Sequence, residues 1–137
     1  MTRINLVPPE ELYDQHLLAE YCETRLLARN MHRYFKSNST KSNIPAQFTL
    51  NTGHCLFFKD KGLYLQKRFG ILRAELIKRK YNPQYDTLDV SAWPATFFND
   101  WSPTERDMNI IRERIKEKVQ KKPNWYKYYG EVVALCK

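Results

Sequence analysis

The sequence has few of the residues that mark unusual classes of protein. Only 4 of its 137 residues are glycine while 42% are apolar, so the chain is expected to fold rather than to remain disordered. It contains no run of about 18 apolar residues, which argues against a membrane-spanning helix. The apolar region of a signal peptide is also missing, because Val7 is followed by Pro8-Pro9-Glu10-Glu11. We therefore expect a cytoplasmic protein that is not secreted.

Cysteine is scarce as well. The 3 cysteines, Cys22, Cys55 and Cys136, are odd in number, lie far apart and form no C-x-x-C pair. This spacing indicates neither a disulfide framework nor a zinc site, and reduced thiols are the default for a cytosolic protein. The sequence thus predicts no metal site.

What the chain has in excess is positive charge. Lys and Arg number 23 against 15 Asp and Glu, which gives a net charge of +8 and a pI near 9.4. Such a balance favours a polyanionic partner such as nucleic acid, and ordinary solubilising charge is the alternative. A chain of this length is expected to form one domain over residues 1–137.

Apolar periodicity predicts three long helices joined by polar loops. The first is expected to begin in the stretch 8–11, because proline suits the first turn and acidic side chains favour its positive end. The second is expected to run from Asp60, a suitable N-cap, to about Tyr81. The third has Ser102 as its N-cap and Glu105 three positions later, which is the pattern of a capping box.

The second helix carries one apolar and one basic face. Its predicted buried stripe is Leu65, Phe69, Leu72 and Leu76. Basic residues lie off this stripe, and a solvated face or contact with phosphates would explain them equally well. They are Lys67, Arg68, Arg73, Lys78, Arg79 and Lys80.

Two segments are predicted to be loops. Residues 36–53 are polar and contain Pro45, which bars a regular helix. Residues 82–101 contain several aromatic side chains that we expect to pack on the core or within the loop. The adjacent His54 and Cys55 could suggest a base and a nucleophile, but adjacency gives no geometry, so we interpret them as structural.

Two polar residues interrupt the apolar face of the first helix. Leu12, His16, Ala19, Glu23 and Leu26 recur at helical spacing. Seven residues turn a helix by about 700°, which places His16 and Glu23 on nearly one face, about 10 Å apart along the axis. A glutamate on such a face is either paired with a basic neighbour or functional. A histidine there is more often a satisfied core residue than a ligand.

The third helix is predicted to present a basic stripe to a partner. Its buried stripe is expected at Met108, Ile111, Ile115 and Val119. A second stripe, beside the buried one, consists of Arg114, Lys118 and Lys121. A rigid helix can hold such side chains against the phosphates of a nucleic acid, and a solvated face is again the alternative.

The segment after Pro123 is rich in aromatic residues. Trp125, Tyr126, Lys127, Tyr128 and Tyr129 combine four rings with one cation. This composition suits stacking on bases together with attraction to phosphates. The alternative is a segment pinned to the core by its rings, and both hold if alternate side chains face opposite ways.

The start of the chain offers a nucleophile. If Met1 is removed, the small residue Thr2 has a free α-amine beside the cationic Arg3. The pKa of an α-amine is about 8, against about 10.4 for a lysine side chain, so much more of it is neutral and nucleophilic at pH 7. Such an amine is a usable nucleophile if the fold holds it beside a carboxylate.

These residues together resemble a known family. The matching segments are 1–6, 14–23, 51–54, 57–65 and 123–130, of which the first reads Met1-Thr2-Arg3-Ile4-Asn5-Leu6. They are similar to the pyrimidine-dimer DNA glycosylases of phages and algal viruses, the endonuclease V type that cuts at ultraviolet photoproducts. The likeness is weakest over residues 24–45 and 82–101.

The resemblance implies a fold and a reaction. It implies a compact all-α single domain of three main helices with long loops, whose N-terminal segment passes between helices. The Thr2 α-amine would attack the sugar of the 5′ base of a cyclobutane dimer and form an imine, or Schiff base, while Glu23 stabilises positive charge and assists proton transfer. β-Elimination would then nick the strand, an AP-lyase activity that needs no cofactor.

The resemblance also implies a partner and its contacts. The partner would be double-stranded DNA with pyrimidine dimers or abasic sites, bound by a monomer during base excision repair in the nucleoid or in an infected host cell. Arg3, Gln15 and His16 would line the DNA site. Arg114, Lys118 and Lys127 would meet phosphates. The family bends the duplex and flips out a base opposite the lesion, which fits the general need to expose a buried target.

One departure from the family pattern lies beside the expected active site. The family usually has arginine before the catalytic glutamate, where this chain has Cys22. A neutral thiol supplies no charge-assisted phosphate contact, and we expect Arg25 to compensate. Two alternatives remain open: the same amine chemistry on another damaged base or on abasic sites, and a non-enzymatic basic DNA-binding protein.

Overall fold

Long helices make up most of the structure. The computed structural model describes residues 4–37, 44–50 and 53–132. The helices are α1 (Asp14–Ser37), α2 (His54–Phe57), α3 (Gly62–Lys78) and α4 (Glu105–Lys121), with 3₁₀ turns η1 (Pro9–Glu11) and η2 (Ala95–Phe97) and the short antiparallel strands β1 (Lys127–Tyr128) and β2 (Glu131–Val132). The all-α class with three main helices is therefore confirmed. The small C-terminal hairpin was not predicted.

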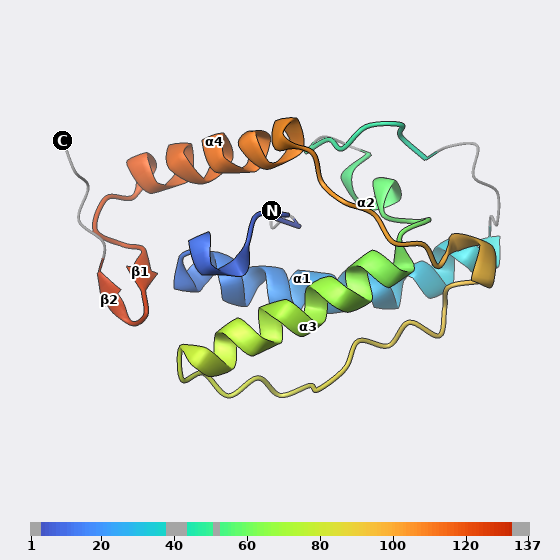
Figure 1. Cartoon of the computed structure of the whole chain (residues 1–137), viewed down its shortest axis with the longest axis horizontal. Coiled ribbons are helices and arrows are strands. Elements are labelled where there is room, and N and C mark those ends of the chain that lie inside the picture. Colours follow the sequence, from blue (N-terminus) through green and yellow to red (C-terminus); the bar gives the residue numbers. More distant parts are fainter. Residues whose placement is uncertain (1–3, 38–43, 51–52, 133–137) are drawn as a thin grey trace.

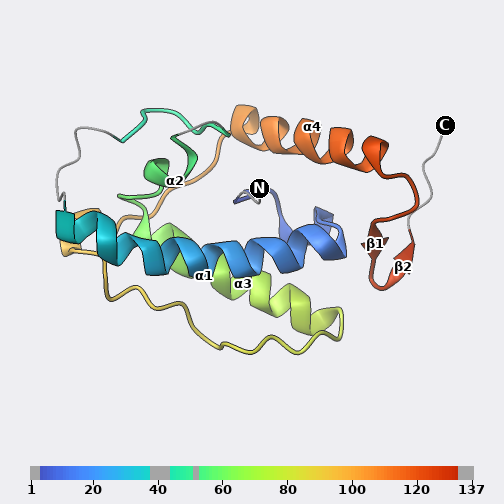
Figure 2. The ribbon, with the colours of Figure 1, turned by 180° about the vertical axis from the view of Figure 1, so that it is seen from behind.

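The N-terminal segment lies between the helices. Figure 1 shows α1 and α3 packed side by side, with α4 on the other side of the N-terminal segment, and Figure 2 shows the same arrangement from behind. Ile4, Leu6, Val7 and Leu12 are all at most 4% exposed. The predicted packing of this segment between helices is confirmed, and it brings the residues from Ile4 onward into the interior.

The apolar stripes predicted for α3 and α4 form the core. The α3 residues Leu65, Phe69, Leu72 and Leu76 are at most 1% exposed. On α4 the positions Ile111, Ile115 and Val119 are buried, and Met108 is half-buried at the edge. The period of about 3.6 residues was thus sufficient to identify the face of each helix that packs inward.

The first helix begins later than predicted. Pro9–Glu11 form the 3₁₀ turn η1, and α1 starts only at Asp14. The backbone of Leu12 is extended (ψ 142°), which ends the turn before α1 begins. Arg79 holds this arrangement by donating hydrogen bonds to the carbonyl oxygens of Leu12 (2.7 Å), Pro9 (3.1 Å) and Glu10 (3.4 Å).

The bounds of α3 and the role of its basic residues also differ from prediction. The N-cap is Lys61 and not Asp60, whose carboxylate accepts from Lys61 Nζ at 2.8 Å. The helix ends at Lys78, and Lys80 has a φ of 69°. Arg68 and Arg79 are only 3% and 6% exposed, so neither is a solvated or phosphate-facing side chain.

The capping box of α4 lies two residues after the predicted one. Thr104 is the N-cap, and its side chain accepts from the backbone of Asp107 (3.2 Å) while the Asp107 carboxylate accepts from the backbone of Thr104 (3.1 Å). Ser102 and Glu105 fill the same pattern in the sequence. The preceding Trp101 packs against the rings of Phe57 and Tyr64, which keeps the chain before Thr104 on α2 and α3.

Where the structure describes them, the two predicted loops agree with it except at residues 36 and 37, which are the last residues of α1. Residues 44–50 contain no regular helix, and residues 82–101 contain only the short turn η2. Most rings of the second loop pack as expected: Trp93 and Phe97 are buried, whereas Tyr85 is 41% exposed. Among the described residues no helix is long and apolar enough to cross a membrane.

Candidate nucleic-acid interface

A cavity between α1 and α4 gathers many of the predicted site residues. Its volume is about 180 Å³. We call it the α1–α4 cavity, and it is lined by Asn5, Gln15, His16, Ala19, Arg114, Lys118, Trp125 and Tyr126. The first helix, the N-terminal segment, the basic stripe of α4 and the aromatic C-terminal segment thus meet at one place, although they are far apart in the sequence.

His16 is buried in this cavity without the partners expected of a core histidine. It is 8% exposed and its ring stacks on Tyr126, with centroids 4.7 Å apart and planes 19° apart. Neither ring nitrogen has a hydrogen-bond partner among the described residues. Burial, followed by the charges of Arg114 and Lys118, lowers the pKa of His16 from 6.5 to about 4. The ring is therefore neutral at pH 7 and offers one donor and one acceptor to a ligand.

Gln15 holds the aromatic segment in place. Its side-chain Nε2 donates to the carbonyl of Trp125 (2.8 Å), and its Oε1 accepts from the backbone of Lys127 (2.9 Å). Between these two bonds the side chains alternate: Tyr126 is 7% exposed and Trp125 is 50% exposed. The sequence left open whether this segment packs on the core or faces a partner. Tyr126 packs on the core, whereas Trp125 is exposed.

The hairpin that follows is joined to α1 and α3 through buried charged side chains. Its turn has positive φ at both Tyr129 (53°) and Gly130 (82°), the geometry of a type I′ turn. The Asp14 carboxylate accepts from the backbone of Tyr129 (3.0 Å) and of Gly130 (2.7 Å). Arg79 donates to that carboxylate (3.0 Å) and also to Glu75 (2.8 Å). These contacts fix the end of the cavity that Trp125 lines.

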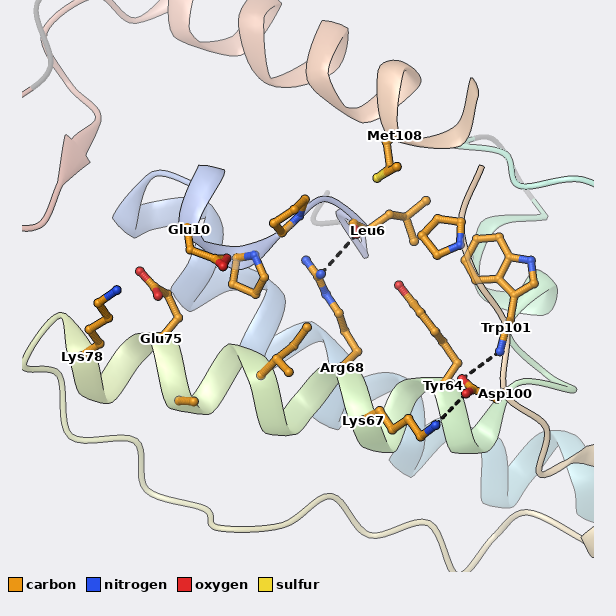
Figure 3. Close-up of a pocket in the computed structure, with 15 residues that line it drawn as sticks. Leu6, Glu10, Tyr64, Lys67, Arg68, Glu75, Lys78, Asp100, Trp101 and Met108 are labelled. Carbon is orange, nitrogen blue, oxygen red and sulfur yellow. Dashed lines mark hydrogen bonds and ion pairs between the residues drawn. The ribbon is translucent and has the colours of Figure 1, made fainter. Parts of the chain in front are cut away.

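The N-terminal segment is held from the opposite side by α3. Arg68 donates to the carbonyls of Val7 (2.7 Å) and Leu6 (3.2 Å) and pairs through two bonds with Glu20 (2.6 and 3.0 Å). Figure 3 shows the Arg68 side chain reaching the segment at Leu6, in a second pocket of about 670 Å³. Burial opposes the charge of Arg68, but Glu20 outweighs it and raises the pKa. Glu20 is thus a buried, ion-paired acid of α1.

Glu23 lies on the α1 face that lines the cavity. It is half-buried, seven residues after His16 and four after Ala19. Residues four apart on a helix lie on the same face one turn apart, so Glu23 extends the lining of the cavity along α1. Thr2 and Arg3, the expected nucleophile and its neighbour, lie outside the described residues.

Three further predicted contacts lie away from the cavity lining. Lys121 is exposed on α4 and Lys127 is exposed on β1. Arg25 lies about 180–200° around α1 from His16 and Glu23. Its guanidinium covers the ring of Tyr85 at 3.4 Å from the centroid. Cys22 is an exposed free thiol on α1, and Arg25, three positions later, lies about 60° from it around the helix.

Sequence reasoning missed three polar residues of this region. Asn5 is 1% exposed, lines the cavity and has an Oδ1 without a partner among the described residues. Its place between the apolar Ile4 and Leu6 was the available signal, since a buried polar group needs a partner. Asp14, which accepts from the backbone of the hairpin, had no signal in the sequence. His54 was interpreted as structural, but its contact with the backbone of the N-terminal segment was not predicted.

Comparison with models of protein families gives a match. The model of a family described as pyrimidine dimer DNA glycosylase matches residues 1–89. The matched range includes the N-terminal segment, α1 and α3, and it ends before α4 and the hairpin. No group of three or more potential metal-binding side chains occurs among the described residues.

Proposed function

We propose, from the premise that this chain belongs to the pyrimidine dimer DNA glycosylase family, that it excises cyclobutane dimers through the α-amine of Thr2 and then nicks the strand. Family membership makes the protein a DNA repair glycosylase whose substrate is DNA containing pyrimidine dimers. Use of the α-amine and the lyase step are our proposal. Its main support is the α1–α4 cavity, where basic and aromatic side chains meet the α1 face that carries Glu23.

The proposed reaction begins after Met1 has been removed. The neutral amine of Thr2 attacks C1′ of the 5′ nucleotide, a C–N bond forms, and the glycosidic bond breaks with its electron pair on the departing base, which takes up a proton. Opening of the sugar ring leaves a cationic imine between Thr2 and C1′. Glu23 would stabilise this positive charge, which is present only along the reaction path.

The imine makes the second step possible. It acidifies the C2′ protons because electrons from a broken C2′–H bond can flow toward the cationic nitrogen. Glu23 would accept that proton, and the C3′–O bond would then break with the phosphate as leaving group. Addition of water to the remaining imine returns the free amine. The two steps together require no reactant other than the protein, the DNA and water.

The basic and aromatic residues would hold the DNA during these steps. Arg114 and Lys118 line the cavity and would contact phosphates, with the exposed Lys121 and Lys127 adding attraction. The half-exposed Trp125 offers a ring to an unstacked base. Arg3 and Arg25 remain predicted contacts. The protein is expected to act as a single-domain monomer.

Borohydride trapping tests the proposal directly. The protein lacking Met1 is mixed with a duplex that contains one cyclobutane dimer, and borohydride reduces the imine to a stable adduct that mass spectrometry locates. We expect the adduct on Thr2. Folded protein that binds the duplex but forms no adduct would overturn the imine mechanism. Duplexes with an abasic site or an oxidised pyrimidine show whether the lesion range differs, and adducts with abasic duplex alone would favour that alternative.

Two variants separate the roles of the nucleophile and of its electrostatic partner. Thr2→Pro should slow trapping because it makes the amine secondary and stiff. Glu23→Gln should abolish turnover yet leave DNA binding within about twofold, since the side chain keeps its size and loses its charge. Glu117→Gln is the matched control, because this glutamate is exposed on α4. Turnover by Glu23→Gln at the rate of the control would remove Glu23 from the mechanism.

A further inference from the structure

We propose that His54 is a positioning residue for the α-amine of Thr2. His54 is the first residue of α2 and belongs to none of the cavity-lining elements. Its Nε2 accepts a hydrogen bond from the backbone N–H of Ile4 at 3.0 Å. Ile4 lies two residues after Thr2, and this role of His54 rests on the proposed use of the Thr2 amine.

One neutral tautomer of His54 satisfies both of its ring contacts. An N–H group donates to Nε2, which must therefore carry a lone pair. Nδ1 lies 2.8 Å from the carbonyl oxygen of Thr49, so Nδ1 carries the proton and donates. The ring thus links the N-terminal segment to the loop before α2, and reversing its tautomer would break both bonds.

Packing fixes the orientation of this ring. His54 is 3% exposed, and Phe48 and Phe58 meet it nearly edge to face at centroid distances of 5.4 and 5.5 Å. Ile4 is fully buried. A buried ring held on two sides cannot follow a moving chain, so the acceptor for the Ile4 N–H stays at one place.

Arg68 holds the N-terminal segment at residues that lie further along the chain from the nucleophile. Arg68 holds the carbonyls of Leu6 and Val7, and the φ of Leu6 is 59°, a conformation that a non-glycine residue keeps only when its surroundings impose it. From Ile4 to Thr2 the chain spans at most about 7 Å, and from Leu6 to Thr2 about 14 Å. Without the His54 contact, the length of chain between Thr2 and its nearest hydrogen-bonded anchor would double. The volume open to the amine would then increase about eightfold.

The expected effect is therefore on the chemical step and not on DNA binding. An amine that searches a volume about eight times larger meets C1′ less often, so the single-turnover rate should fall about tenfold. The α1–α4 cavity does not include His54, and affinity for DNA should stay within about twofold. A purely structural role would instead lower folded fraction, affinity and rate together.

Two substitutions test the role of His54 Nε2 as the acceptor for the Ile4 N–H. His54→Leu removes it, and His54→Gln offers an amide oxygen in a similar place. We measure the rate of borohydride trapping on dimer duplex at saturating protein, the affinity for a duplex with a tetrahydrofuran abasic analogue, and the residue that carries the adduct. His54→Leu should trap about tenfold more slowly with unchanged affinity, and a larger share of its adducts should fall on lysines. His54→Gln should recover most of the rate. Leu88→Ala, a core substitution in the 82–101 loop, is the control for lost stability.

A semisynthetic protein tests the same hydrogen bond if His54→Leu fails to fold. Cys22 permits native chemical ligation of a synthetic peptide of residues 2–21 to the chain from 22 onward. An ester in place of the amide between Arg3 and Ile4 removes only the N–H donor and leaves every side chain, including His54, intact. This protein should show the same tenfold fall in trapping rate as His54→Leu.

The outcomes separate this inference from the proposed function. Absence of a Thr2 adduct in the wild-type protein overturns the proposed function, and the positioning role with it. A wild-type adduct together with wild-type rates in His54→Leu and in the ester protein overturns only the role of His54. Parallel losses of rate and affinity would also overturn it. Faster hydrogen exchange of the Ile4 amide in His54→Leu, without DNA present, supports the anchor independently of any chemistry.

Discussion

Replacement of His16 by phenylalanine should make the protein less sensitive to acid. The pKa of His16 is lowered from 6.5 to about 4, first by burial and then by Arg114 and Lys118. The folded protein therefore binds this proton more weakly than the unfolded chain does. The contribution of the neutral His16 to the free energy of unfolding is therefore complete above pH 6.5 and is lost as the pH falls toward 4. Proton linkage predicts that the free energy of unfolding decreases by about 2 kcal/mol at pH 5 and by about 3 kcal/mol at pH 4.

Urea unfolding at pH 7 and pH 5 measures this effect. Phenylalanine keeps a ring against Tyr126 and cannot titrate, so the wild-type protein should lose about 2 kcal/mol more than His16→Phe between the two pH values. His32→Asn is the control, because the side chain of His32 is 54% exposed and lies 3.9 Å from Asp89. Other acid-sensitive groups are common to all three proteins. Parallel pH dependence of the wild type and His16→Phe would refute the assignment of a buried neutral histidine.

Three further predictions concern the contacts around the cavity. Gln15→Leu should lower the free energy of unfolding by about 1–3 kcal/mol, because the backbone of the aromatic segment loses both partners, whereas the exposed Gln66→Leu should change it by less than about 0.5 kcal/mol. Glu20→Gln should cost about 3–5 kcal/mol in urea unfolding by leaving a buried guanidinium without its carboxylate, while the surface substitution Asp86→Asn should cost at most about 1 kcal/mol. Lys118→Ala should reduce the slope of log affinity for DNA against log salt by about 0.9, and an unchanged slope would mean that it meets no phosphate.

The sequence was most informative where periodicity decides the structure. Leu65, Phe69, Leu72 and Leu76 follow the helical repeat, and their burial follows from it. Helix starts were less predictable because several residues fit the same local pattern. Ser102 and Thr104 both have an acidic residue three positions later, and only packing of the preceding Trp101 distinguishes them.

The candidate site was predicted in its composition but not in its geometry. The meeting of His16 with the basic stripe of α4 required α1 and α4 to be placed in space, and periodicity says nothing about this. Arg79 is an example: in the sequence it resembles the other cations of a basic helix face, but in the structure it binds groups 65–70 residues away. A sequence pattern gives no signal for a contact that is formed by the fold itself.

The buried hub at Arg79 has a consequence for the order of folding. A two-stranded hairpin of this size has no stability of its own in water. Its turn is held by Asp14 and Glu75, groups 54–116 residues away that come together only once α1 and α3 have packed. We therefore expect the hairpin to form last and to open first, as a local unit whose opening costs less than global unfolding. The aromatic face that would receive DNA thus belongs to the part of the molecule that can rearrange while the helical core stays intact.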